Sequence, residues 1–141
     1  MQINIKRLSL NVPMPEYKTA GAVAFDLAVS EDGVIEPSET KIFPTGLIIQ
    51  VPENHALILA SRSSNAKKGI SLANGIGIID QDYCGPNDEL HLAVHNFLNQ
   101  PYTVEKGERI AQGLFVPIVK AEFVETNEIS KTDRGGFGTT G

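Results

Sequence analysis

The chain has little of what disulfide-rich, secreted or membrane proteins depend on. Cys84 is its single cysteine, which excludes an internal disulfide and fits a reducing compartment. No apolar run approaches the ~20 residues that a membrane-spanning helix needs. The first residues, Met1 to Arg7, lack the basic head and apolar run of a signal peptide. The sequence therefore predicts a cytoplasmic protein that does not contact membranes.

Positive charge is also scarce. The 141 residues include 12 Lys and Arg against 17 Asp and Glu, so the net charge is -5. Binding to DNA or RNA depends on many cations that release counterions from the phosphate backbone, so this balance argues against a nucleic-acid-binding protein. A compact anion such as a nucleotide needs only a few local cations and is compatible with it.

Helical periodicity is missing as well. No window predicts an amphipathic helix of ten or more residues, and short apolar runs alternate with turn residues instead. The predicted strands are Ile3 to Leu10, Gly46 to Val51, Ala56 to Ala60, Glu89 to His95 and Leu114 to Val119. Leu90, Leu92 and Val94 share one face of the fourth, and Pro117 gives the fifth an edge or bulge position. The fold class is therefore all-β, as a sandwich, jelly roll or barrel.

The chain divides into a body and a tail. Residues 1–125 are long enough for one β domain, in which Ser63 to Lys68 form a helical turn or two that ends at Gly69. Residues 126–141 are polar and then glycine-rich, so they are expected to form a flexible C-terminal tail that packs no core.

One carboxylate follows the apolar run Ile76 to Ile79. We expect this run to belong to a tight hairpin that starts at Asn74 and presents Asp80, Asp82 and Tyr83. A carboxylate held in this way can accept a proton from an attacking water. The alternative is that Asp80 and Asp82 only favour the turn, as aspartates often do.

Arg62 leaves an apolar strand among the hydroxyls of Ser61, Ser63 and Ser64. A guanidinium with adjacent hydroxyls suits phosphate, although a solvated arginine in a polar loop is the plainer interpretation. We expect Lys67 and Lys68 to be solvated.

Two polar residues in other strand-like runs have open roles. Asp26 can hold a metal through waters or fix Arg62 by a charge-assisted hydrogen bond. Gln112 can position a water or a phosphate, or serve only in packing.

Two histidines lie four residues apart on a predicted strand. Their side chains are then roughly 13 Å apart, so His91 and His95 are not expected to share a metal. Cys84 is interpreted as a small packing residue.

The glycine-rich end carries one cation, Arg134, and one ring, Phe137. Glycine-rich backbone with an arginine suits phosphate, and a ring on a flexible segment suits stacking on a base.

Taken in order, five motifs resemble those of the trimeric dUTPases and cover nearly the whole chain. They are Ala24 to Ala28, Ser61 to Ala66, Asn74 to Gly85, Gly107 to Gln112, and Arg134 to Gly141. The resemblance implies a homotrimer of distorted jelly-roll subunits that share active sites between chains. It implies hydrolysis of dUTP to dUMP and pyrophosphate with Mg²⁺ carried by the triphosphate, which keeps uracil out of DNA and supplies dUMP for thymidylate synthesis.

The same resemblance implies roles for individual residues. Asp80 would activate the water that attacks the α-phosphorus, and Asp26 would bear on the water shell of the metal. Tyr83 would pack on the deoxyribose and exclude a 2′-hydroxyl. Phe137 would stack on uracil as the tail closes, with Arg134 near the γ-phosphate. The other implied substrate-binding residues are Arg62, Ser63, Ser64 and Gln112 for phosphates, Asn74, Gly77, Ile78 and Ile79 for uracil, and His91, Gly136 and Gly138.

The chain departs from the family pattern at several places. The Gly-Tyr that commonly precedes the aspartate of the first motif is Ala24-Phe25 here, and the loop after the second motif is one residue shorter. Asn65 stands where an apolar residue is usual, and Gly85 to Glu89 contain an insertion. Arg134 and Phe137 are two residues closer together than is common in the family.

Three other functions fit the sequence less well. A dCTP deaminase would use a glutamate in the hairpin and lack the glycine-rich tail. A nucleotide-sensing or protein-binding module would not need the full set of polar residues. A purely structural trimer would leave the tail without a role.

Overall fold

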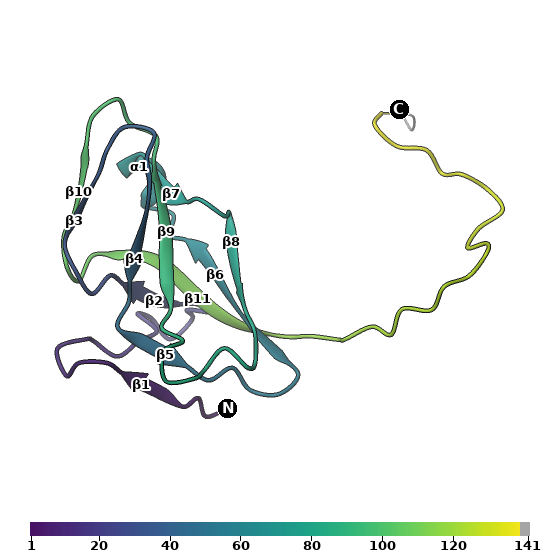
Figure 1. Ribbon diagram of the computed structural model, residues 1–141, viewed down its shortest axis with the longest axis horizontal. Helices are drawn as coiled ribbons and strands as arrows, with labels where there is room; N and C mark the ends of the chain where they lie inside the picture. Colours follow the sequence, from purple (N-terminus) through teal and green to yellow (C-terminus); the bar gives the residue numbers. More distant parts are fainter. Residues whose placement is uncertain (139–141) are drawn as a thin grey trace.

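A computed structural model describes residues 1–138; residues 139–141, the last part of the predicted tail, lie outside the described residues. Almost all regular structure is strand, which confirms the all-β prediction (Figure 1). The elements are β1 (Ile5–Arg7), β2 (Phe25–Ala28), β3 (Gly33–Ile35), β4 (Thr40–Pro44), β5 (Leu47–Ile49), β6 (His55–Ser61), α1 (Asn65–Lys68), β7 (Ile70–Leu72), β8 (Ile76–Ile79), β9 (His91–Asn96), β10 (Tyr102–Val104) and β11 (Arg109–Pro117). The short helix and its end at Gly69, which has a φ of 71°, are as predicted.

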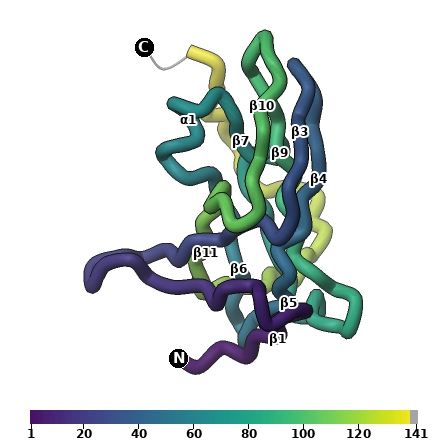
Figure 2. Tube along the Cα trace, turned by 90° about the vertical axis from the view of Figure 1, so that its left-hand side faces the viewer, coloured from purple at the N-terminus to yellow at the C-terminus, as the bar shows by residue number. Residues whose placement is uncertain are grey.

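The strands form a jelly-roll-like body of small antiparallel sheets. The largest has the order β2-β11-β6-β8, the next has the order β4-β9-β7, and β1-β5 and β10-β3 form two-stranded pairs. Strands that follow one another in the chain pass between sheets, so neighbours in a sheet come from distant segments. Figure 2 shows the loop between β1 and β2 projecting from one side of this body.

The core lies between the two larger sheets. Leu90, Leu92 and Val94 are at most 1% exposed, which confirms the predicted buried face of the β9 segment. From the other sheet, Leu57 and Leu59 of β6 meet them in the same apolar cluster. Burying each such side chain contributes roughly 1.5–3 kcal/mol, so this face holds the body together.

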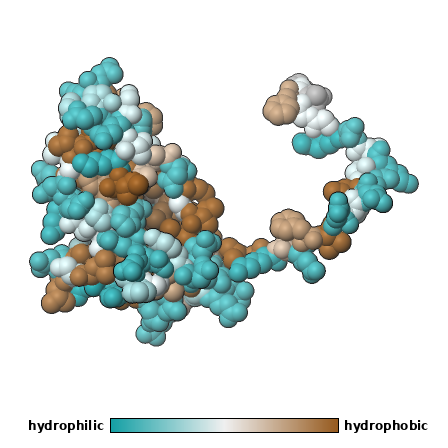
Figure 3. All heavy atoms as spheres, in the orientation of Figure 1, coloured by the Kyte–Doolittle hydropathy of each residue, from teal (hydrophilic) through white to brown (hydrophobic). Residues whose placement is uncertain are grey.

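The outer face of the β2-β11-β6-β8 sheet is also apolar. Its register places Leu114 opposite Ile58, and Ile58 opposite Ile78. Ile76 and Ile78 are 52% and 62% exposed, and Figure 3 shows hydrophobic side chains on this side of the body, facing the tail. An antiparallel sheet with one solvated face normally presents polar residues there, so this face is unusual for a free surface.

The segment from Asn74 does not form the predicted hairpin. The turn around Gly75, which has a φ of 72°, carries the chain out of the sheet that contains β7 and into the sheet that contains β6. The strand after it, β8, pairs with β6 and lies at the edge of that sheet. The glycine turn was predicted correctly, but a turn signal does not reveal which strand becomes the partner.

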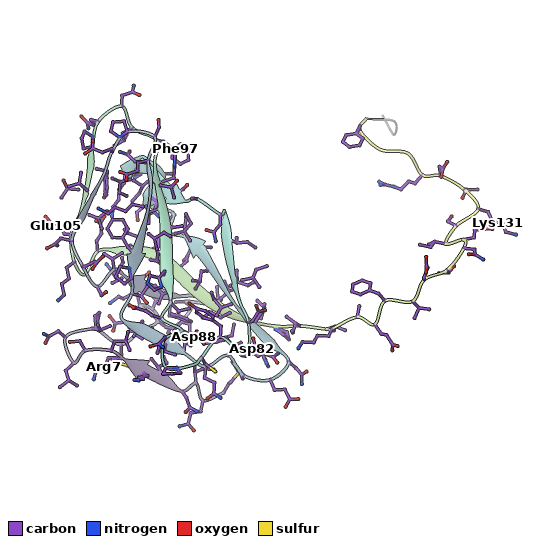
Figure 4. The ribbon with its side chains drawn as sticks, viewed as in Figure 1. Arg7, Asp82, Asp88, Phe97, Glu105 and Lys131 are labelled. Atoms are coloured by element: carbon purple, nitrogen blue, oxygen red, sulfur yellow. The ribbon has the colours of Figure 1, made fainter. Side chains whose placement is uncertain are left out.

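The chain leaves the body after Pro117. At this residue β11 pairs only with β6, because its pairing with β2 ends at Gly113; Pro117 therefore has the edge position that was predicted. Residues 119–138 are all exposed and contain no described strand or helix (Figures 1 and 4). The extended segment is thus longer than the predicted tail of residues 126–141.

A buried asparagine fastens the β3-β10 pair to the rest of the body. Asn96 is fully buried, and its Nδ2 donates to the carbonyls of Ile35 and Gln100, both at 2.9 Å, and of Glu36 at 3.3 Å. Its Oδ1 accepts from the backbone N–H of Leu98 at 2.9 Å.

Replacing this side chain should be costly. We expect Asn96→Ala to lower the free energy of unfolding by about 3 kcal/mol, because buried carbonyls lose their donor. Urea unfolding at fixed protein concentration measures this. The control Asn99→Ala, at an exposed position of the same loop, should change stability by less than about 0.5 kcal/mol. Equal stability of the two variants would contradict the anchoring role of Asn96.

Candidate active site

Two arginines converge on one carboxylate at the end of β6. Arg62 Nε lies 2.7 Å from Asp26 Oδ1, and Arg109 Nη1 lies 2.8 Å from Asp26 Oδ2. Arg62 Nη1 also donates to the Arg109 carbonyl at 3.2 Å. Both oxygens of Asp26 therefore accept from guanidiniums, which favours the anchoring role over the metal-water role among the two that the sequence left open. The cluster carries one net positive charge, which suits a phosphate.

Arg109 was missed by sequence reasoning. It sits inside the Gly107 to Gln112 motif, next to a residue that was singled out, yet nothing in one sequence shows that its side chain reaches Asp26 in β2. The pairing of β11 with β2 brings them together.

Two serines follow Arg62. Ser63 is exposed, and Ser64 is the N-cap residue of α1 without making a side-chain capping bond. Among the described residues, the Oγ of Ser64 has no hydrogen-bond partner. Ser63 therefore offers an exposed hydroxyl beside Arg62, whereas the Ser64 hydroxyl is buried.

Gln112 joins the same group. The sheet register places it opposite Asp26 on one side and Ala60 on the other, so its side chain lies on the outer face of the sheet. Its Nε2 donates to the Ser61 carbonyl at 3.0 Å. The structure therefore brings together four predicted phosphate residues and Asp26.

Asp80 lies at the other end of the same sheet. It directly follows β8, where Ile79 pairs with Leu57, and it lines an open cavity of about 440 Å³. His55 and Lys120 line this cavity as well. Sequence reasoning missed both, because no motif surrounds either His55, the first residue of β6, or Lys120, near the start of the extended segment.

Tyr83 and His91 meet at one backbone carbonyl. The Tyr83 hydroxyl donates to the Glu89 carbonyl at 3.0 Å, and His91 Nδ1 lies 2.8 Å from the same oxygen. The Glu89 side chain accepts from the Gly46 N–H at 2.6 Å and so ties this loop to the body. The two residues are therefore neighbours, as their shared assignment to a substrate site requires.

The inserted residues form an ordered turn. Asp88 Oδ2 accepts from the Gly85 N–H at 2.7 Å, and the Asp88 N–H donates back to the Gly85 carbonyl at 3.2 Å. Figure 4 shows Asp82 and Asp88 near each other at one end of the body.

The predicted uracil-reading residues form the free edge of a sheet. Gly77, Ile78 and Ile79 belong to β8, whose only strand partner among the described residues is β6. Such an edge presents backbone donors and acceptors that a planar polar ring can pair with. Asn74 is exposed just before it.

The two halves of the site are far apart within one chain. Asp80 lies beside Ala56 at the start of β6, whereas Arg62 follows its end; this stretch of strand spans about 20 Å at ~3.3 Å per residue. Figure 1 shows α1 near one end of the body and the loop after β8 near the other. Arg134, Gly136, Phe137 and Gly138 lie on the extended segment, away from both.

No cluster of three or more His, Cys, Asp or Glu side chains suited to a metal occurs among residues 1–138. His91 and His95 have different partners: His95 Nδ1 lies 2.9 Å from the Thr40 hydroxyl. Within the same residues, no helix is long and apolar enough to cross a membrane.

A second charged cluster lies behind the arginines. Lys68 Nζ and the Tyr102 hydroxyl each lie 2.6 Å from Glu108 Oε1. Lys68, for which the sequence predicted a solvated side chain, is thus paired with Glu108 and only partly exposed, while Lys67 is exposed as predicted.

This cluster shifts two pKa values. Burial acts to raise the pKa of Glu108, but hydrogen bonds from Lys68 and Tyr102 and the attraction of the Lys68 ammonium together lower it. Burial first, and then the hydrogen bond to Glu108, raises the pKa of Tyr102 well above its usual range.

Comparison with known proteins gives a consistent result. The family model described as dUTPase matches residues 10–141. A deoxyuridine 5′-triphosphate nucleotidohydrolase of Nautilia profundicola is 40% identical over 144 residues, covering 100% of this chain and 99% of the relative. The corresponding protein of Actinobacillus succinogenes is 42% identical, covering 96% and 91%.

Solved structures agree with these relatives. The dUTPase from Streptococcus mutans superposes with a TM-score of 0.78 at 32% identity, over 87% of this chain and 100% of that one. The dUTPase of Staphylococcus bacteriophage 80alpha with dUPNHPP has a TM-score of 0.86 at 27% identity, over 99% and 98%.

The lowered pKa of Glu108 gives a pH-dependent contribution to stability. Because its folded pKa lies below the ordinary value of 4.5, the charged form stabilises the fold above that value, and the contribution is lost as pH falls through the folded pKa. Glu108→Gln should therefore melt at a lower temperature than the parent at pH 7, with a gap that narrows below pH 4.5. Calorimetry from pH 7 downward measures this. A gap independent of pH would contradict it.

Proposed function

The chain belongs to the dUTPase family, and from this premise we propose how it hydrolyses dUTP to dUMP and pyrophosphate. Asp80 accepts a proton from the water that attacks the α-phosphorus. The support is its place at the end of β8, where a carboxylate is held by anchored backbone and lines an open cavity. This position of Asp80, beside the free edge of β8, is the observation on which the proposal depends.

The phosphates bind at the other end of the sheet. Arg62, Ser63 and Gln112 contribute a guanidinium, an exposed hydroxyl and an amide, and the buried hydroxyl of Ser64 lies in the same loop. Phosphoryl transfer requires mainly positioning and charge neutralisation, and these groups supply both. Asp26 holds Arg62 in place for this task.

Mg²⁺ accompanies the triphosphate. Magnesium is commonly bound by substrate phosphates and one or two carboxylates, with waters completing its shell, so the site needs no protein cage of its own. When bound, Mg²⁺ neutralises charge on the phosphate oxygens. Asp26 is the carboxylate closest to the phosphate residues, and it would act on the metal only through water, because its oxygens already accept from two arginines.

Base and sugar are read near Asp80. The free backbone groups of Gly77, Ile78 and Ile79, with Asn74 before them, pair with uracil. Tyr83 packs on the deoxyribose and leaves no room for a 2′-hydroxyl, with His91 beside it at the Glu89 carbonyl. A filled pocket rejects an added group by overlap, which discriminates more strongly than a missing contact.

The active unit is a homotrimer in which each site uses several chains. The ~20 Å between Asp80 and Arg62 is too far for one chain to complete a site around a single nucleotide. The apolar outer face with Ile58 and Ile78 supports burial against a second copy. Val119 and Phe123 on the extended segment are 96% and 95% exposed, which supports docking of that segment on another subunit.

The tail closes the site. Residues 126–141 bring Phe137 onto the uracil and Arg134 toward the γ-phosphate, with Gly136 and Gly138 allowing the backbone to approach. Closure excludes bulk water, so that only the positioned water attacks.

The proposed hydrolysis of dUTP to dUMP also defines the role of the enzyme in the cell. Removing dUTP keeps uracil out of DNA, and dUMP supplies thymidylate synthesis. The single cysteine fits a reducing compartment, and we place the enzyme in the cytoplasm.

Substitution of the proposed base tests the mechanism. Asp80→Asn should bind a non-hydrolysable dUTP analogue within about tenfold of the parent but lower kcat at least ~100-fold, because only the proton acceptor is lost. Pyrophosphate release measures kcat. The matched control is Asp82→Asn, two residues along the same turn, which should keep near-parental turnover. Near-parental turnover of Asp80→Asn would sink the assignment.

Removal of the tail separates assembly from activity. Truncation after Ser130 should leave the fold and the trimer intact, with a mass by light scattering near three times that of the shortened chain, but remove most activity. Phe137→Ala should be milder, because stacking on one base is worth ~1–3 kcal/mol. The dUTP analogue with Mg²⁺ should protect the parent's tail from limited proteolysis. Full activity of the truncated protein would show that the tail takes no part.

A further inference from the structure

The segment that carries the proposed phosphate residues has little regular structure of its own. Between β6 and β7 it contains only α1, of four residues, whose N-cap Ser64 makes no side-chain capping bond. Isolated helices need far more length to be stable in water, so α1 depends on contacts with the rest of the body. The position of Arg62, Ser63 and Ser64 must therefore be fixed from outside.

Residues 108–112, from the residue before β11 to the fourth residue of that strand, provide these contacts. The pairs, from one end to the other, are Ser61 carbonyl with Gln112 Nε2 at 3.0 Å, Arg62 Nη1 with the Arg109 carbonyl at 3.2 Å, Asn65 Nδ2 with the Ile110 carbonyl at 2.7 Å, and Lys68 Nζ with Glu108 Oε1 at 2.6 Å. Four polar contacts thus join residues 61–68 to residues 108–112. Gln112, itself a phosphate residue, belongs to the same strand.

We propose that Lys68, Glu108 and Asn65 are positioning residues that dock the Arg62–Ser64 loop onto β11, so that the phosphate ligands of both segments form one rigid unit. This inference rests on the proposed phosphate role of Arg62. None of the three touches the substrate in this account. They act by fixing where Arg62, Ser63 and Ser64 stand relative to Gln112.

Burial and charge give the Lys68–Glu108 contact its strength. The Glu108 side chain is only 16% exposed and also accepts from the Tyr102 hydroxyl, so its Oε1 is held from two sides. A partly buried carboxylate that loses its cation is left uncompensated, which costs more than the loss of an exposed pair. The ion pair therefore holds the far end of the segment firmly.

Asn65 fixes the middle of the segment between β6 and β7. It is 1% exposed, and its Oδ1 has no partner among residues 1–138, which is an energetic cost that an apolar residue would avoid. The position nevertheless keeps an amide, and the one bond that this amide makes is to the Ile110 carbonyl. A positioning role accounts for an asparagine where the family usually has an apolar residue.

Charge removal and charge exchange test the proposal together. We compare Glu108→Gln, Lys68→Met and the exchanged pair Lys68→Glu with Glu108→Lys, in the full-length trimer. The matched controls are Glu105→Gln and Lys67→Met, exposed neighbours of the same charge. Two affinities are measured for each protein by titration calorimetry, one for a non-hydrolysable dUTP analogue with Mg²⁺ and one for dUMP.

Each single variant should lower the affinity for the analogue by about five- to tenfold but the affinity for dUMP by less than about twofold. The reason is that only the triphosphate contacts the whole loop. KM for dUTP should rise in parallel, while kcat changes less than about threefold. In the exchanged pair, the affinity for the analogue should return to within about twofold of the parent value. Asn65→Leu should show the same preferential loss with little change in melting temperature, since the unpartnered oxygen is removed as well.

Two results would overturn the positioning role. One is an equal loss of affinity for the analogue and for dUMP. The other is an unchanged affinity for the analogue in both Glu108→Gln and Lys68→Met. Arg62→Ala distinguishes these from failure of the proposed function. If Arg62→Ala lowers the affinity for the analogue and the other variants do not, only the positioning role is wrong. If Arg62→Ala has no effect, the phosphate assignment and the positioning role are both wrong.

Discussion

The length of β6 is the constraint on which the site depends. This strand pairs with β8 at one end, where Asp80 emerges, and leads into Arg62 at the other. An extended strand has a fixed length, so the proposed proton acceptor and the proposed phosphate residues of one chain stay about 20 Å apart. A single nucleotide cannot span them. This geometry supports the proposed sharing of sites between subunits, and the apolar outer face of the same sheet is the surface that we propose for assembly.

At the proposed phosphate end, charged groups hold one another in place. Asp26 orients Arg62 and Arg109, and Glu108 fixes Lys68. A guanidinium that is already hydrogen-bonded on one side loses less freedom when it meets a phosphate on the other. Positioning of this kind matters because phosphoryl transfer depends on where fixed charges stand.

Much of the fold and site could be predicted from local patterns. The alternation of Leu90, Leu92 and Val94 identified a buried strand face, and Gly69 marked the end of the helical turn. Pairing between distant segments could not be read in this way: β8 joined β6 rather than forming a hairpin, and Arg109 and Lys68 acquired partners 83 and 40 residues away. These outcomes depend on how strands are distributed between sheets, which one sequence without its partners does not display. His55 and Lys120 reached the Asp80 cavity for the same reason.

The central claim is that one site takes Asp80 and Arg62 from different subunits. The direct measurement mixes two impaired variants, Asp80→Asn and Arg62→Ala, in equal amounts, unfolds and refolds them together, and assays pyrophosphate release. Random assembly of shared sites should restore about a quarter of parental activity, because each of the two residues is intact in half of the chains. Activity that stays at the average of the two variants refolded separately would show that each chain completes its own site and would contradict the account.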